Sequence, residues 1–215
     1  MNKITKLIFS LFFFLACSSS AEDSIIIDYK DFSNPKIWEP KIKEGKPSTK
    51  VHKDKELKVE VLRLRSFEAS YYFQKSVNVD ISKYNTFSWQ WKVRRHPLNG
   101  DVRVGSRDDQ AIQVLLAFEG RNLISYIWDS NAPVGYSKDS SIPFIVSQKI
   151  LVVQSGDDKK TLNKWFTFNR DINADYKKLY GKNAPKLAGV AIQINSQHTE
   201  SFCESYVSPL KFIAK

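Results

Sequence analysis

Strict alternation of apolar and polar side chains is the feature that most constrains the fold of this chain. In the segment TFSWQWKV, Phe87, Trp89, Trp91 and Val93 share one parity, and polar side chains share the other. Successive side chains of a strand point to opposite faces, so this segment predicts a β-strand with one buried face. Trp89 and Trp91 then belong to the core, although paired tryptophans on one face can also form a stacking platform for sugar rings.

Short segments with strand character recur along the chain and are separated by turn signals. The segment EGRN between two such runs predicts a hairpin. The predicted strands lie within residues 25–27, 55–66, 70–84, 111–118, 123–129, 144–156, 186–195 and 205–214.

One segment has helical spacing instead. Within NRDINADYKKLYG, Asp171 is placed to cap a helix start and Gly181 to end it. Many short strands with a single helix predict an all-β fold: a single antiparallel β-sandwich of the jelly-roll type, galactose-binding or lectin-like, with one short helix near residues 170–181.

The N-terminus has the pattern of an export signal. Lys3 and Lys6 precede the apolar run LIFSLFFFLA, and small residues follow. Two processing routes fit: a signal peptide of residues 1–21, or a lipoprotein signal of residues 1–16 with Cys17 as the lipidated residue. Either route leaves a single predicted domain over residues 22–215, exported to the periplasm or anchored to the membrane by its lipid.

Cysteine content and charge limit the chemistry of the exported chain. Cys203 is the cysteine that remains after Cys17, so no internal disulfide is expected, and a buried apolar role is the simplest one for it. The whole chain has 33 basic and 23 acidic residues; without Lys3 and Lys6 the formal charge falls from +10 to +8. In an exported protein this charge either maintains solubility or attracts anionic lipid headgroups and envelope polymers, and a nucleic-acid partner is not expected.

Two adjacent carboxylates, Asp108 and Asp109, stand directly before an apolar run. They can be the solvated start of a strand, ligands of a bound molecule or of calcium, or a catalytic pair. Catalytic carboxylates of glycosidases face each other at roughly 5 to 10 Å, which neighbouring strand residues do poorly. Calcium is the one cofactor that such an acidic pair suggests.

Three further residues complete the set of candidate ligand contacts. Trp128 ends a predicted strand beside a long loop, and Asn195 and His198 lie in the polar stretch after another strand. No Gly-x-Ser-x-Gly, His-Glu-x-x-His or phosphate-binding glycine motif is present in the sequence, and the three histidines lack zinc-ligand spacing.

The ordered segments WQWKV, DDQAIQVLLAFEG, YIWDSNAPVG, VVQSG, RDINADY and LAGVAIQINSQHT resemble an exported bacterial family catalogued as a domain of unknown function. The resemblance covers about residues 25–213 and implies a single β-sandwich in the style of jelly-roll carbohydrate-binding modules. The chain departs from the family pattern where Gln113 replaces an arginine. Asn195, Gln197 and His198 stand where that pattern has an aspartate-containing turn, which argues against strong cation binding because amides are weaker ligands than carboxylates.

The sequence therefore favours a non-catalytic, exported binding module of the cell envelope, whose partner is an envelope glycan or an anionic envelope component. An envelope polysaccharide hydrolase or lyase that uses Asp108 or Asp109 with His198 is the first alternative. A structural or assembly protein of the envelope is the second.

Overall fold

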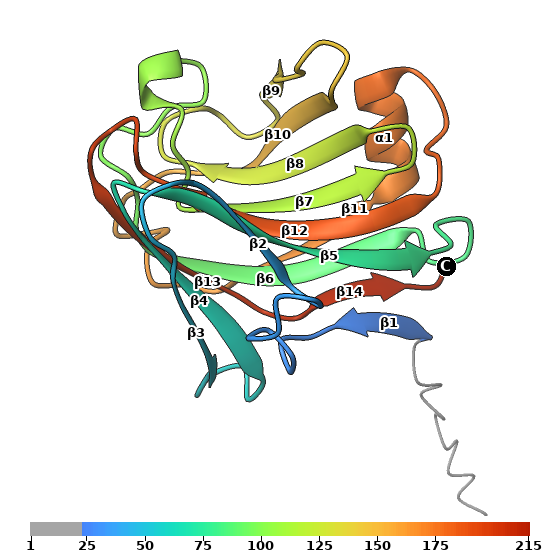
Figure 1. The fold of residues 1–215 in the computed structure, drawn as a ribbon, viewed down its shortest axis with the longest axis horizontal. Helices are drawn as coiled ribbons and strands as arrows, with labels where there is room; N and C mark the ends of the chain where they lie inside the picture. Colours follow the sequence, from blue (N-terminus) through green and yellow to red (C-terminus); the bar gives the residue numbers. More distant parts are fainter. Residues whose placement is uncertain (1–22) are drawn as a thin grey trace, which may run out of the picture.

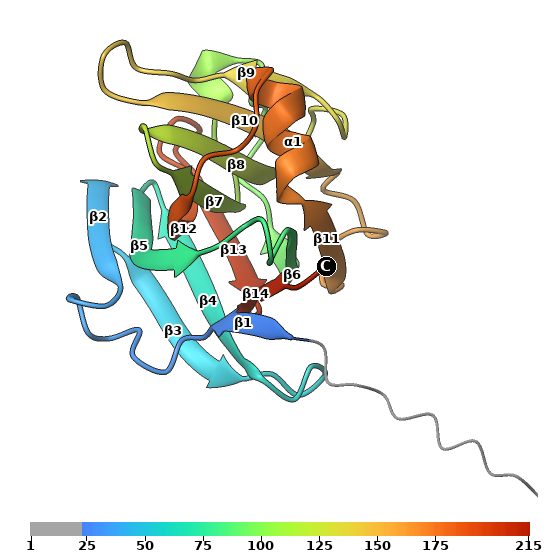
Figure 2. The same ribbon diagram turned by 90° about the vertical axis from the view of Figure 1, so that its right-hand side faces the viewer.

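Two seven-stranded β-sheets stack face to face in the computed structural model, which describes residues 23–215 (Figures 1 and 2). Sheet A contains β1 (Ser24–Ile27), β14 (Leu210–Ile213), β6 (Thr86–Arg95), β13 (Phe202–Val207), β4 (Glu60–Phe67) and β3 (Ser48–Lys53), with β11 (Phe166–Asp171) paired to β6. Sheet B contains, in order, β2 (Glu39–Glu44), β5 (Ser70–Val79), β12 (Leu187–Asn195), β7 (Ile112–Phe118), β8 (Asn122–Asp129), β10 (Ser147–Ser155) and β9 (Ser137–Asp139). The prediction of an all-β sandwich with one short helix is confirmed.

The alternating strand β6 runs through sheet A and supplies the centre of the core. Trp89 and Trp91 are fully buried, as are Phe87 and Val93 on the same face. The ring of Trp89 stacks on Tyr126 of sheet B with centroids 5.3 Å apart. Both sheets therefore share one hydrophobic core, and the core role predicted for the two tryptophans is confirmed.

One strand pair departs from the antiparallel pattern. β7 and β8 form the predicted hairpin, but β10 runs parallel to β8. Parallel neighbours need a long crossover connection, which here spans residues 130–146 and includes β9. This connection passes over the outer face of sheet B and helps to shape the surface described below.

Residues 23–215 contain one α-helix, α1 (Ile172–Tyr180), which joins β11 of sheet A to β12 of sheet B. The Asp171 carboxylate accepts a hydrogen bond from the Ala174 amide at 3.0 Å, and Gly181 ends the helix in the left-handed conformation. These caps are the ones that the sequence predicts.

Cys203 on β13 is a free, fully buried cysteine, and burial raises the pKa of its thiol. Within residues 23–215, the helical segments are too short and too polar to cross a membrane. The predicted leader and Cys17 lie outside the described residues and stay predictions.

Candidate functional site

The outer face of sheet B carries a groove. Strand pairing places the outward side chains in rows, and one row contains Tyr72 of β5, Gln193 of β12 and Gln113 of β7. The groove has a volume of about 510 Å³, which falls within the range of small-molecule sites. It is therefore the first candidate for a ligand site on this face.

The floor of the groove is apolar, and polar side chains border part of it. Leu115, Ala117 and Ala191 form the floor, whereas Gln74 and Gln148 place amides at the sides. An amide offers both donors and an acceptor, so this lining suits a ligand that carries hydroxyl groups around an apolar body.

The loop between β9 and β10 forms one wall of the groove. Ile142 and Ile145 of this loop line it, and Phe144 at the tip is fully exposed with φ +63°. Arg121 holds the tip by donating from Nη1 to the Phe144 carbonyl at 3.2 Å. An exposed aromatic residue in a left-handed conformation is uncommon and is often found at functional sites.

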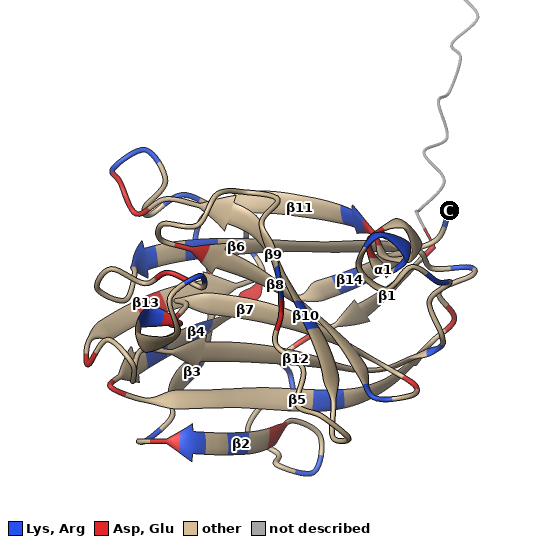
Figure 3. Cartoon of the chain, turned by 90° about the horizontal axis from the view of Figure 1, so that it is seen from above, with Lys and Arg blue, Asp and Glu red and all other residues tan. Residues whose placement is uncertain are grey.

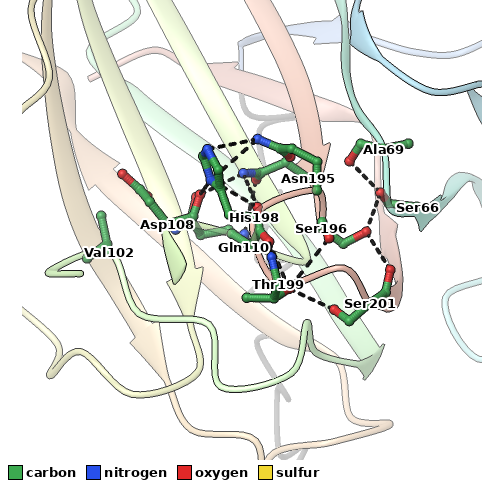
Figure 4. Close-up of polar contacts among 12 residues, drawn as sticks. Ser66, Ala69, Val102, Asp108, Gln110, Asn195, Ser196, His198, Thr199 and Ser201 are labelled. Atoms are coloured by element: carbon green, nitrogen blue, oxygen red, sulfur yellow. Dashed lines mark hydrogen bonds and ion pairs between the residues drawn. The ribbon is translucent and has the colours of Figure 1, made fainter. Parts of the chain in front are cut away.

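Gln193 lines the groove and is paired with Gln113, and a polar cluster begins at Gln113. Figure 4 shows the cluster around Asn195. Asn195 is at its centre: its amide donates to the Asp108 carbonyl at 2.8 Å and to Asp109 Oδ1 at 2.9 Å. Its oxygen accepts from the Gln110 amide at 3.0 Å and from Gln113 Nε2 at 3.1 Å. All four hydrogen-bonding positions of this buried side chain are thus used.

Asp109 is completely buried. Its Oδ2 accepts from the amide of Thr199 at 2.7 Å and from the Thr199 hydroxyl at 2.8 Å. His198 Nδ1 lies 3.5 Å from Asp109 Oδ1, and the His198 side chain is 45% exposed. Asp109 therefore orients its neighbours, while the His198 side chain is more exposed to solvent than that of Asp108 or Asp109.

Asp108 points to different partners from Asp109. Its Oδ2 accepts from Lys138 Nζ at 2.9 Å and its Oδ1 from Gln110 Nε2 at 2.9 Å. Because Lys138 already supplies the positive charge that a cation would bring, the two carboxylates as folded do not form a calcium site. No group of three or more His, Cys, Asp or Glu side chains among residues 23–215 could hold a metal ion.

Two loops build the cluster. Gly100 lies in the loop before β7, and a Cβ built on it would come within 2.7 Å of the Asp109 carbonyl, so only glycine fits this approach. In the turn after β12, Ser196 Oγ lies 2.7 Å from Ser66 Oγ of β4 and donates to the Ser201 carbonyl at 2.8 Å. These hydroxyl contacts fix the turn that carries His198 and Thr199 (Figure 4).

Trp128 does not lie at this site. It is fully buried between the sheets, and its indole Nε1 donates to the Gly156 carbonyl at 2.9 Å. Its ring packs edge-on against Phe166 at 5.3 Å. On β8 it shares the inward parity of Ile124 and Tyr126, so its position beside a long loop did not indicate exposure.

The structure thus brings Asp108, Asp109, Asn195 and His198 together, and places Trp128 in the core. Sequence reasoning missed the groove itself, which depends on Tyr72 and Gln193. The parity of β12 contained a signal for it, since Gln193 shares the outward face with Asn195.

Comparison with protein families finds one family that matches most of the chain. The family described as Protein of unknown function (DUF3047) matches residues 36–211. The chain belongs to the DUF3047 family. The predicted resemblance to a family of unknown function is confirmed, and the matched part of this DUF3047 chain includes both the groove and the polar cluster. No curated protein matches the sequence.

Two of the solved structures similar to this DUF3047 chain are a xyloglucanase domain and a carbohydrate-binding module. The xyloglucanase domain of NopAA, a type three effector from Sinorhizobium fredii solved with cellobiose, has a TM-score of 0.50 at 10% identity and covers 80% of this chain and 92% of that one. The family 11 carbohydrate-binding module of cellulase Lic26A-Cel5E from Clostridium thermocellum has a TM-score of 0.46 at 14% identity, over 91% and 97% of the chains. At these identities the likeness concerns the fold.

Proposed function

We propose that this DUF3047 protein is a non-catalytic module that binds a glycan chain in the outer groove of sheet B. The observation that carries the proposal is the lining of the groove, where amide side chains and Tyr72 border an apolar floor. Sugar rings present hydroxyl groups at their edges and apolar C–H faces, so they match both parts of such a lining. The ligand recorded with the similar NopAA domain, cellobiose, is of this chemical class.

A binding experiment tests the proposal directly. Isothermal titration of the full chain with cellohexaose, xyloglucan and xylan oligosaccharides should give saturable binding with at least one of them. Tyr72→Ala should weaken that binding about 10-fold, which corresponds to about 1.4 kcal/mol, because the variant loses the aromatic side of the groove. Asn169→Ala, an exposed position on β11 of sheet A, is the matched control and should bind like the parent. Lack of binding to the whole panel, or unchanged binding by Tyr72→Ala, would refute the groove as a glycan site.

One observation favours an enzymatic alternative, a polysaccharide hydrolase or lyase. Asp109 lies 3.5 Å from the ring of the exposed His198, an arrangement that can orient a histidine as a general base. Against it, Asp109 itself is buried and cannot contact a substrate. Incubation of the same glycans with the protein should release no new chain ends. Release that disappears in His198→Ala would establish the enzyme instead.

We also propose that the protein acts in the cell envelope after export. The proposal rests on the basic start, apolar run and small residues of segment 1–21. Mass spectrometry of protein purified from expressing bacteria should show a mature N-terminus at Glu22 or a lipidated Cys17. An intact Met1 would contradict export.

A further inference from the structure

The outer face of sheet A carries a second polar surface, on the opposite side of the sandwich from the groove (Figure 2). Strand pairing places Lys50 of β3, Arg63 of β4, Tyr206 of β13 and Lys92 of β6 in one row across four strands. Charged residues elsewhere are spread over strands, loops and α1 (Figure 3). In this row Lys50 lies opposite Arg63, and Tyr206 lies between Arg63 and Lys92.

Aromatic rings lie among these cations. Lys92 Nζ lies 4.5 Å from the ring centroid of Trp165 and 5.2 Å from that of Tyr206. The ring of His52 packs edge-on against Tyr206, with centroids 5.6 Å apart. We call His52, Arg63, Lys92, Trp165 and Tyr206 the Tyr206 cluster.

Three buried nitrogen atoms of the Tyr206 cluster have no hydrogen-bond partner within residues 23–215: His52 Nδ1, Arg63 Nε and Trp165 Nε1. The nitrogens of Arg63 and Trp165 always carry a hydrogen and can only donate. A buried donor without an acceptor costs stability, so such groups are usually satisfied by a protein group, water or a ligand. Unpartnered donors gathered around one aromatic centre indicate a ligand rich in acceptors.

The charge balance of the surface also favours an anion. Asp54 lies 3.4 Å from Lys92, and Glu204 pairs with Arg65 at 2.9 Å, so both carboxylates are occupied and nearly buried. Burial tends to raise the pKa of Glu204, but hydrogen bonds from Tyr206 and Arg65 lower it overall, which keeps this carboxylate charged and paired. Within the described chain, Arg63 and Lys50 form no ion pair.

We propose that the Tyr206 cluster and the neighbouring Lys50 bind an acidic saccharide, through its carboxylate or sulfate groups to Arg63 and Lys50 and through its ring face to Trp165. A thin chain is favoured over a lipid headgroup layer because the centre of the surface is recessed: the side chain of Lys92 is 17% exposed, and Arg63 Nε and Trp165 Nε1 are buried. A flat bilayer surface cannot reach side chains at that depth. This site uses residues separate from the groove, so it does not depend on the proposed function.

The test uses two kinds of acidic chain of equal length. Isothermal titration of the full chain with hexameric oligogalacturonate, and with a sulfated oligosaccharide of the same length, should give saturable binding. Arg63→Gln should weaken it about 10-fold, since a charged hydrogen-bond donor is lost. Lys211→Gln, an exposed position on β14 of the same sheet, removes the same charge and should change binding less than about 2-fold.

Two further variants keep the test decisive. Lys50 is exposed, so Lys50→Gln should weaken binding without affecting folding. Trp165→Phe keeps an aromatic ring but removes the N–H group that has no hydrogen-bond partner. Tyr72→Ala, in the groove of sheet B, should bind oligogalacturonate like the parent, which separates failure of this site from failure of the groove. Equal losses in Arg63→Gln and Lys211→Gln, or no binding to either acidic chain, would overturn the proposal. Binding to phosphatidylglycerol vesicles that oligogalacturonate cannot displace would overturn it in favour of a lipid surface.

Discussion

At the scale of single residues, His96 is a buried group whose ionisation opposes folding. It follows β6, lies edge-on to Trp128 with centroids 5.3 Å apart, and neither ring nitrogen has a partner within the described residues. Burial lowers the pKa of His96 from 6.5 to about 3. In the unfolded chain His96 therefore binds a proton near pH 6.5, whereas in the folded protein it does so only near pH 3. The free energy of unfolding falls as the pH drops from 6.5 towards 3.

We predict that His96→Phe stabilises the protein. The gain should be about 1 kcal/mol at pH 7, because an unsatisfied polar ring is removed, and should grow by up to about 1.4 kcal/mol per pH unit below 6.5. Urea unfolding at pH 7 and pH 5 measures both the gain at pH 7 and its increase at lower pH. An equal gain at both pH values would contradict the assigned cause.

Asn195 and His198 are neighbours in the polar cluster but should behave differently. Asn195→Ala removes a buried side chain with four hydrogen bonds and leaves its partners unsatisfied, so unfolding should cost about 2–4 kcal/mol less. His198→Ala should change the free energy of unfolding by less than about 0.5 kcal/mol, because the side chain is 45% exposed. Comparable losses in both variants would mean that His198 is structural.

At the scale of elements, α1 is stabilised by its ends. Asp171→Ala should lower the free energy of unfolding by about 1 kcal/mol through loss of the cap. Gly181→Ala should cost about the same, because φ +69° is unfavourable for a residue with a Cβ. Lys178→Ala, at an exposed position inside the helix, is the control. Urea titrations in which all three variants match the parent would show that the caps carry no weight in this fold.

The parallel pairing of β10 with β8 shapes the outer face of sheet B. It sends the connection over the outer face of sheet B, where Val102, Ile127, Ala132, Ile150 and Val152 form a small second core. The same connection carries Ile142 and Ile145 into the groove wall. The crossover thus both covers one part of sheet B and builds a binding surface on another.

At the scale of the whole molecule, one core joins the two sheets. Four of the five tryptophans are fully buried, namely Trp38, Trp89, Trp91 and Trp128, so tryptophan fluorescence reports mainly the shared interior, whereas far-UV circular dichroism reports the strands. We predict that the two signals follow one coincident transition in urea, because neither sheet can lose the other and keep its apolar face buried. Separated transitions would show that the sheets unfold independently.

The sequence by itself determined the features that depend on neighbouring residues. The alternation through Trp89 and Trp91 fixed a strand with a buried face, and Asp171 and Gly181 fixed the ends of the helix. The chain also contained the hairpin between β7 and β8. Each of these follows from side-chain direction or turn chemistry within a few residues, so no long-range information was needed.

Only the tertiary structure decided which surfaces those elements form. Asp109 meets Thr199 across 90 residues of sequence, and Trp128 turned inward although its sequence neighbours suggested exposure. Lys50, Arg63 and Lys92 became one surface because β3, β4, β13 and β6 pair in a particular register. Strand order and register are set by burial of both sheets in a common core, and that packing is a property of the whole chain.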